Sequence, residues 1–271
     1  MKGRVLIIAG SDPSGGAGIQ ADIKTVTALG GYASTAITAL TVQNTKGVTA
    51  VLQTPPDFIR DQIDAVLSDI GADAIKIGMI GDVAAAQSIL DALQSMKADS
   101  SDGTQTPMVL DPVLVATSGD ALAASGVATF IRERLIPICE VVTPNLDEAE
   151  ALTSVSISSP DDQSRAGEKL LKLGAKAALI SGGHIAGDTI TDVLATKEGT
   201  RLFSNPKIET TSTHGTGCTL ASAIAVGLAQ ALPLERAVER AIAYVRKAIE
   251  TAPSFGAGAG PVNHTHPLDA D

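Results

Sequence analysis

The chain has 271 residues, of which 44% are hydrophobic but only 2% aromatic, and its 20 basic and 30 acidic side chains give a net charge of −10. This length suits one large α/β domain or two small ones, built around an aliphatic core. The acidic balance excludes an extended nucleic-acid surface, because such surfaces bind phosphates through many lysines and arginines. A nucleotide ligand is still compatible, since helix N-termini and a metal ion supply local positive charge.

Cysteine content and apolar runs bear on the compartment. Cys139 and Cys218 are the two cysteines; they could pair, but such sparse cysteine favours a reducing cytosol, so we expect a cytoplasmic protein. The apolar run after Met1 is too short for a signal peptide. The uncharged run at 215–234 superficially resembles a membrane span, but it is rich in alanine and contains Thr, Ser, Gln and Pro. We therefore predict a buried helix there and no membrane attachment.

In the first half of the chain, short apolar runs alternate with segments of helical spacing. The pattern predicts strands at 5–9, 33–40, 48–52, 74–77 and 108–110. It predicts helices at 19–29, 55–70 and 82–96. Glycine, proline and polar residues predict loops at 10–18, 41–47 and 97–107.

The second half continues the alternation. Helices are predicted up to 135 and at 146–152, 161–172 and 234–250, besides the one that begins near 216. Strands are predicted at 141–142 and 177–180, with a hairpin of 193–195 and 202–204. This order indicates an α/β fold, a mostly parallel sheet with helices on both faces. No linker divides the chain, so we expect one domain over 1–271, with a Gly/Pro/His-rich and partly mobile tail at 253–271.

Polar and glycine residues follow most of the predicted strands. In a parallel sheet, ligands bind beyond the carboxyl ends of the strands, so these segments predict a small-molecule site. They are Gly10–Gly18 with Asp22, Gln43-Asn44-Thr45, Gly78-Met79, Asp111-Pro112-Val113, Thr143-Pro144-Asn145 with Glu148, and Ser181-Gly182-Gly183-His184.

Each segment also has a purely structural interpretation. Residues 15–18 form neither a G-x-G-x-x-G fingerprint nor a P-loop, and also suit a tight turn. Asp111 could cap a turn, and Asn145 with Glu148 could form a helix capping box. The other residues with an ordinary structural explanation are Met79 and Cys139 as core, His184 and His214 as hydrogen-bonded loop histidines, and His264 and His266 as tail residues without convincing partners.

The segment Thr213-His214-Gly215-Thr216-Gly217-Cys218 precedes an alanine-rich apolar run. This pattern predicts a tight loop that leads into the N-terminus of a buried helix. Free N–H groups and the helix dipole favour an anion there, and glycines let the backbone approach a phosphoryl oxygen. The same positive end favours the thiolate form of Cys218. We therefore predict an anion cradle beside a candidate base.

The chain resembles the hydroxymethylpyrimidine/phosphomethylpyrimidine kinases of thiamine biosynthesis. The resemblance is carried, in order, by Ala9–Asp22, Ala39–Thr45, Lys76–Met79, Thr143–Leu146 and His214–Leu220. It implies a ribokinase-like three-layer fold, ATP with Mg²⁺, and a homodimer. It also implies two successive phosphorylations, of 4-amino-5-hydroxymethyl-2-methylpyrimidine and then of its monophosphate.

The resemblance also assigns expected roles. It implies a pyrimidine pocket of Gly10, Asp22, Gln43, Met79 and Val113, nucleotide contacts from Asn145, Gly182, Gly183 and Thr213, metal-side carboxylates Asp111 and Glu148, and phosphoryl donors Gly215, Thr216 and Gly217. Cys218 stands where most ribokinase-like enzymes carry an aspartate base. One departure is Ser181, which occupies a position where the family commonly has lysine.

Three other functions are compatible with these residues. Pyridoxal or pyridoxine kinases phosphorylate similar ring alcohols. A non-catalytic pyrimidine- or nucleotide-binding protein is kept open by Ser181. A hydrolase would use Cys218 as a covalent nucleophile near His214, but no Asn or Asp is placed to complete a triad.

Overall fold

The molecule is organised on one sheet of nine strands within the residues that the computed structural model describes, 1–99, 105–115, 119, 122–183 and 187–268. The strand order is β3-β2-β1-β4-β5-β6-β7-β8-β9. Strands β2, β1, β4, β5, β6 and β7 run parallel, while β3 and the β8–β9 hairpin add antiparallel edges. The strands are β1 (Arg4–Ser11), β2 (Tyr32–Asn44), β3 (Gly47–Gln53), β4 (Ala74–Ile77), β5 (Met108–Leu110), β6 (Val141–Val142), β7 (Ala177–Ile180), β8 (Thr189–Thr196) and β9 (Gly199–Pro206).

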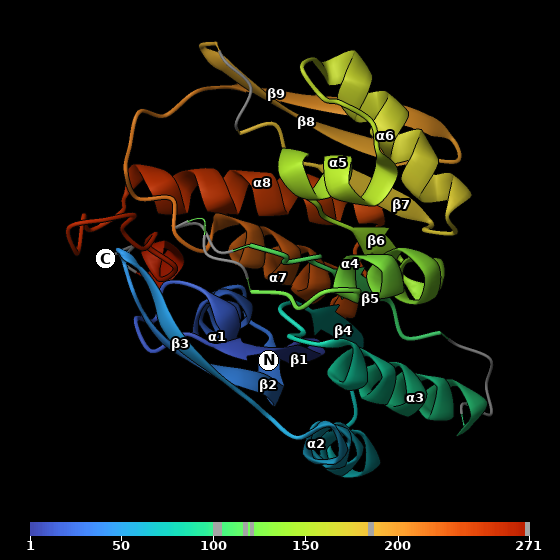
Figure 1. Cartoon of the computed structure of the whole chain (residues 1–271). Helices are drawn as coiled ribbons and strands as arrows, with labels where there is room; N and C mark the ends of the chain where they lie inside the picture. The colour runs from blue at the N-terminus through green and yellow to red at the C-terminus, as the bar shows by residue number, and fades with distance from the viewer. Residues whose placement is uncertain (100–104, 116–118, 120–121, 184–186, 269–271) are drawn as a thin grey trace.

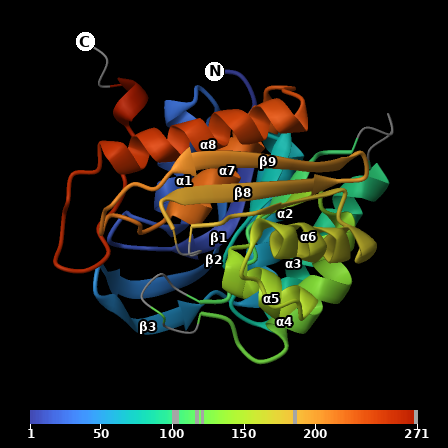
Figure 2. The ribbon, with the colours of Figure 1, turned by 90° about the horizontal axis from the view of Figure 1, so that it is seen from above.

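Helices cover both faces of the sheet (Figures 1 and 2). One face carries α1 (Gly18–Ala28), α7 (Thr216–Ala229) and α8 (Leu234–Glu250). The other carries α2 (Pro56–Asp69), α3 (Val83–Asp99), α4 (Val127–Phe130) with the π-helical turn Ile131–Leu135, α5 (Leu146–Thr153) and α6 (Pro160–Lys172).

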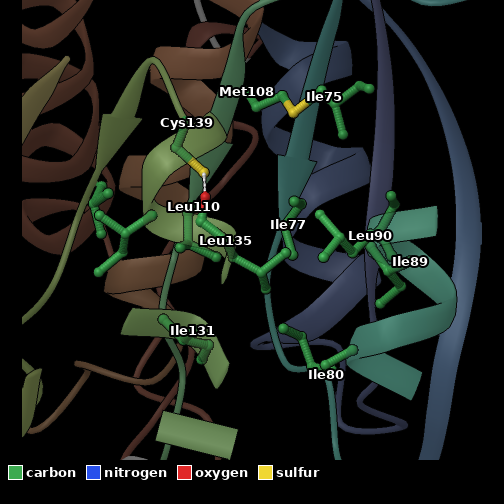
Figure 3. Close-up of a cluster of buried hydrophobic side chains, with 14 of the residues drawn as sticks. Ile75, Ile77, Ile80, Ile89, Leu90, Met108, Leu110, Ile131, Leu135 and Cys139 are labelled. Carbon is green, nitrogen blue, oxygen red and sulfur yellow. Dashed lines mark hydrogen bonds between the residues drawn. The ribbon is translucent and has the colours of Figure 1, made fainter. Parts of the chain in front are cut away.

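The central strands are apolar on both faces because helices bury both. In β1, Val5 and Ile7 pack toward α1, α7 and α8, whereas Leu6 and Ile8 pack toward the opposite helices. Figure 3 shows part of the apolar cluster that contains Leu6 and Ile8, on the face covered by α2 to α6. Here Cys139 Sγ donates a hydrogen bond to the Leu135 carbonyl at 3.1 Å. This cysteine is fully buried, which confirms its prediction as a core thiol.

The main error in the predicted elements lies in the segment 41–47. It was expected to be a polar loop, but β2 continues to Asn44 and pairs with β3 from Gly47. Cross-strand pairs such as Leu40–Leu52 and Val42–Ala50 continue the ladder into this segment. Hydrogen bonding to β3 thus satisfies the backbone of a polar stretch, and Gln43 lies in a strand.

The tail also differs from its prediction. Part of it is buried against the body: Val262 and His264 are each 3% exposed, whereas Phe255 is 66% exposed. His264 Nε2 lies 3.1 Å from Thr219 Oγ1, and His266 Nε2 lies 3.1 Å from the Tyr244 carbonyl oxygen. The prediction that these histidines lack partners is therefore wrong, because partners 20 and more residues away cannot be read from local spacing.

The uncharged run at 215–234 contributes α7, which is buried against the sheet. Among the described residues, every helix is too short or too polar to cross a membrane. The buried-helix prediction is confirmed.

Candidate active site

A cavity of about 800 Å³ lies at the ends of the parallel strands, as the sheet topology predicts. It brings together segments from β1, β5 and β6, the connection from β9 to α7, and α8. The predicted site residues that line it are Gly10, Gln43, Met79, Asp111, Val113, Asn145, Glu148, Gly183, Thr213, Gly215, Thr216, Gly217 and Cys218. Asp22 and Gly182 lie outside the lining.

The anion cradle forms at the start of α7. Gly215 is the N-cap with φ +82°, and a Cβ there would collide with the Gly16 carbonyl oxygen, so only glycine fits. No described side chain caps this helix end. The Thr216 N–H donates to the Thr213 carbonyl at 3.4 Å, whereas Gly215, Gly217 and Cys218 line the cavity with N–H groups that can donate to an anion.

A buried hydrogen bond joins the cradle to the N-terminal glycine loop. His214 Nε2 lies 2.8 Å from Asp12 Oδ2, and this carboxylate also accepts from the Ser14 and Ala17 N–H groups. Burial opposes ionisation of Asp12, but the hydrogen bonds from His214, Ser14 and Ala17 outweigh it and lower its pKa. His214 is thus a hydrogen-bonded loop histidine that holds residues 12–17 against the cradle.

Lys76 is the central residue that the sequence analysis did not assign to the site. It is fully buried in β4, with Nζ 3.0 Å from both carboxylate oxygens of Asp22 and 3.6 Å from Asp111 Oδ2. Burial opposes its charge, but Asp22, Cys218 and Asp111 outweigh burial and raise the pKa of Lys76, so it is an ammonium ion. A charged residue inside a four-residue buried strand was the available signal.

Asp22 lies beneath the cavity rather than at its surface. Its carboxylate accepts from Lys76 Nζ and, at 2.7 Å, from Ser222 Oγ, and its side chain is fully buried. The expected hydrogen bond from Asp22 to a ring edge is therefore corrected: its acceptor positions are already used. The side chain supports Lys76 instead.

Cys218 is a protonated thiol, contrary to the expected thiolate. It is half-buried at the cavity, donates to Asp111 and accepts from the Gly18 N–H. Burial raises the pKa of Cys218 well above its usual value; Lys76 lowers it, and the carboxylates of Asp111 and Asp22 raise it further. Desolvation and two negative charges outweigh the field of the helix end, which was the only influence visible in the sequence.

Asp111 and Glu148 face the cavity as a pair of carboxylates. Asp111 Oδ2 is buried without a hydrogen-bond partner. Glu148 forms a capping box with Asn145, whose Oδ1 accepts from the Glu148 N–H at 2.9 Å, so the structural interpretation of this pair is confirmed. Burial and the charge of Asp111 raise the pKa of Glu148 to about 8. Two carboxylates without a full counter-charge fit a divalent cation.

The ring side of the cavity is built by Gly10, Gln43, Met79 and Val113. Gly10 lies where the β1–β2 register shifts, and a Cβ there would approach Met79 Sδ to 3.0 Å. The Thr41 hydroxyl lies 3.1 Å from Gln43 Oε1, which orients the amide. An amide beside a thioether and an aliphatic side chain can bind a small polar ring.

The opposite end of the cavity was largely missed from the sequence. Its lining is mainly aliphatic with two cations, and comprises Ile190, Asp192, Lys207, Ile208, Ile242, Val245, Arg246 and Ile249. These residues come from β8, the segment after β9, and α8, and apart from the charges on Lys207 and Arg246 they carry no local signal.

Gly182 packs against β8 next to this end of the cavity, outside the lining. Its N–H donates to Asp192 Oδ1 at 2.9 Å, and a Cβ would collide with the Thr191 carbonyl oxygen. Close packing on β8 thus explains both the glycine and its absence from the lining. His184 lies outside the described residues.

Comparison with known proteins shows the family to which the chain is similar. A family model described as phosphomethylpyrimidine kinase matches residues 12–263. The bifunctional thiamine biosynthesis protein ThiED of Geobacter sulfurreducens is 46% identical over 97% of the chain, which spans about half (52%) of that relative. The hydroxymethylpyrimidine/phosphomethylpyrimidine kinase of Streptomyces coelicolor is 43% identical over 96% of the chain and 93% of that relative.

A solved structure extends the likeness to the whole fold. The Bacillus subtilis pyridoxal kinase in an ADP complex matches with a TM-score of 0.89, at 31% identity, over 100% of both chains. The chain belongs to the phosphomethylpyrimidine kinase family. It is a kinase, and the expected ribokinase-like fold is confirmed.

The ion cluster of Lys76 predicts a large asymmetry between two lysines. Lys76→Met leaves Asp22 and Asp111 buried without their cation, and should lower the free energy of unfolding by about 3–5 kcal/mol. Lys247→Met, which removes an exposed pair with Glu250, should cost less than about 1 kcal/mol. Urea unfolding of both variants measures this; equal losses would show that the Lys76 cluster adds no stability.

The raised pKa of Cys218 predicts slow alkylation near neutral pH. Because only the thiolate reacts, the rate with iodoacetamide in a Cys139→Ala background should still be rising above about pH 9, past the point where a free thiol levels off. A cysteine-containing peptide is the control. If the alkylation rate of the protein instead levelled off near neutral pH, Cys218 would be a thiolate, as the sequence had indicated.

Proposed function

We propose that this kinase uses ATP to phosphorylate 4-amino-5-hydroxymethyl-2-methylpyrimidine and then its monophosphate, as a step of thiamine biosynthesis. The observation that carries this proposal is the position of the cradle Gly215–Cys218 in the same cavity as the ring side and the carboxylate pair. The names of the two relatives described above agree with it.

The ring side suits an aminopyrimidine. Gln43 offers an amide that pairs with a ring nitrogen or an exocyclic amino group. Met79 and Val113 pack on the ring, and Gly10 leaves room for it. A hydroxymethyl group on this ring would point toward Cys218.

The opposite end suits the nucleotide. Ile208, Ile242 and Val245 supply apolar surface for a purine base, and Asn145, Gly183 and Thr213 supply polar groups nearer the phosphates. Lys207 and Arg246 provide cations there. Glu209, whose Oε1 lies 4.0 Å from Lys207 Nζ, and Asp192 also line the cavity, so these cations offset the loss of the usual lysine at Ser181 only in part.

Asp111 and Glu148 would hold Mg²⁺. Among the described residues, no group of three or more His, Cys, Asp or Glu side chains could hold a metal. Two carboxylates completed by phosphate oxygens and water are a common way to bind this ion. Asp111 Oδ2 lies 3.6 Å from Lys76 Nζ but accepts no hydrogen bond, so it can also serve as a ligand. When bound, the ion neutralises phosphate charge and part of the Asp111 charge.

The protein's own groups then carry the transfer. The N–H groups of Gly215, Gly217 and Cys218 stabilise charge on the transferred phosphoryl oxygens. Cys218 would act as the base once its thiol has released its proton to solvent, and the Lys76 ammonium stabilises the resulting thiolate. Cys218 Sγ then accepts the hydroxyl proton as the substrate oxygen bonds to phosphorus and the ADP oxygen leaves.

A pyridoxal-type ring alcohol is the second candidate acceptor. The observation that favours it is the whole-chain structural match to a pyridoxal kinase. A cysteine hydrolase fits less well, because His214 is bonded to Asp12 and the Cys218 thiol to Asp111. A binding protein without catalysis would not need the carboxylate pair Asp111 and Glu148 in its cavity.

We also propose a cytoplasmic homodimer. Cys139 and Cys218 are not joined by a disulfide, which suits a reducing compartment. Leu40, Val42 and Leu52 form an exposed apolar face on the β2–β3 hairpin, a surface that a second copy would cover. Sedimentation equilibrium tests the mass.

An ADP-release assay with the pyrimidine alcohol, its monophosphate and pyridoxine as separate acceptors tests the function. We expect turnover with both pyrimidines exceeding that with pyridoxine. Cys218→Ala should lower kcat at least about a hundredfold, since a general base contributes that much, while pyrimidine binding changes little.

Cys139→Ala is the matched control for the cysteine test and should keep its kcat. Wild-type kcat in Cys218→Ala would remove the base assignment. Turnover with pyridoxine alone would replace the pyrimidine substrates with the second candidate.

A further inference from the structure

The glycine-rich tail, which the proposed chemistry does not use, connects two segments that lead into the cavity lining. These are the tip of the β2–β3 hairpin and the loop before the cradle. After α8 the chain returns past the tip of the β2–β3 hairpin toward the start of α7 (Figure 1). Residues Gly256–Gly260, which we name the glycine strap, touch the hairpin tip at one end and the loop before the cradle at the other.

At the hairpin end, the strap is pressed against Thr45. A Cβ on Gly256 would collide with Thr45 Oγ1 and lie 2.9 Å from its Cβ, and a Cβ on Gly258 would collide with the Thr45 carbonyl oxygen. The Gly258 N–H also donates to Thr45 Oγ1 at 3.2 Å. Glycines here permit a backbone approach that no side chain would allow.

At the cradle end, the strap is held by backbone hydrogen bonds. The His214 N–H donates to the Gly260 carbonyl at 3.0 Å, and the Gly260 N–H donates to the Thr211 carbonyl at 3.1 Å. His214 and Pro261 form a β-bridge. This end is the more firmly fixed, so an obstruction between strap and hairpin would displace the hairpin.

These attachments limit the distance between the two segments. Gly258 and Gly260 are two residues apart, a length of chain that spans at most about 7 Å. Gln43 lies two residues before Thr45 in the hairpin, and Gly215 directly follows His214. Both Gln43 and Gly215 line the cavity. The strap therefore fixes the ring side relative to the phosphoryl donors.

We propose that the glycine strap is a positioning element for the acceptor substrate: it sets the separation between Gln43 and the cradle through Thr45 and His214. The proposal rests on the proposed function, because it assumes that Gln43 faces the acceptor. The end assigned to the nucleotide base is built by β8, the segment after β9, and α8, away from the hairpin tip that Gly256 contacts. An obstruction at Gly256 should therefore influence the acceptor and not ATP.

Gly256→Ala tests the strap, with Gly30→Ala as its matched control. Gly256 and Gly30 have φ of +84° and +81°, so both variants carry the same backbone strain, but among the described residues nothing lies within 4 Å of a Cβ on Gly30. We expect Gly256→Ala to raise the KM for the pyrimidine alcohol about tenfold, with the KM for ATP unchanged, because a displaced Gln43 would lose its hydrogen bond to the ring. Gly30→Ala should leave both unchanged.

A double-mutant cycle with Thr45→Gly separates positioning from general damage. Thr45→Gly removes all three atoms that a Cβ on Gly256 would approach most closely, so adding Gly256→Ala to it should raise the pyrimidine KM no further. If Gly256→Ala does not fold, Thr45→Val, which removes the hydrogen bond to Gly258, should raise the pyrimidine KM with ATP unaffected.

Three results would contradict the proposed role of the strap: equal effects of Gly256→Ala and Gly30→Ala, parallel rises in both KM values, or additivity in the double-mutant cycle. For Thr45→Val, an unchanged pyrimidine KM would also contradict it. Failure of the proposed function is distinguishable, because the wild-type protein would then release no ADP with the pyrimidine.

Discussion

A buried cation in the middle of the sheet is the constraint on which the site depends. Lys76 Nζ neutralises Asp22 and lies within 3.6 Å of Asp111, and its charge is among the influences that act on the Cys218 thiol. A lysine in this position would be strongly unfavourable without those partners. Asp111 and Cys218, to which we assign the metal side and the base, are therefore held by one ion cluster.

Much of the fold could be predicted because its signals are local. The strands 74–77, 108–110, 141–142 and 177–180 end where periodicity places them, since buried parallel strands are short apolar runs between helices. The segment 41–47 could not, because its polar side chains resemble a loop while its backbone pairs with β3. The packing of His264 on Thr219 depends on tertiary contact alone.

The site shows the same division between local motif and tertiary environment. The glycines of the cradle and the strand-end residues could be predicted because local spacing alone places them at a helix N-terminus and at the ends of parallel strands, where ligands bind. Lys76 was not predicted, and Asp22 was predicted with a different role, since only the folded sheet brings the two side chains together beside Asp111. The expected thiolate failed for a related reason: a helix N-terminus is visible in sequence, whereas desolvation and neighbouring carboxylates are not.

Phosphorus NMR of one reaction mixture tests the central claim most directly. With ATP, Mg²⁺ and the pyrimidine alcohol, the account predicts a new phosphate monoester signal that is then replaced by a pyrimidine diphosphate, with ADP formed in step. ATP signals that stay unchanged, or that decay to inorganic phosphate without a phosphorylated pyrimidine, would contradict it.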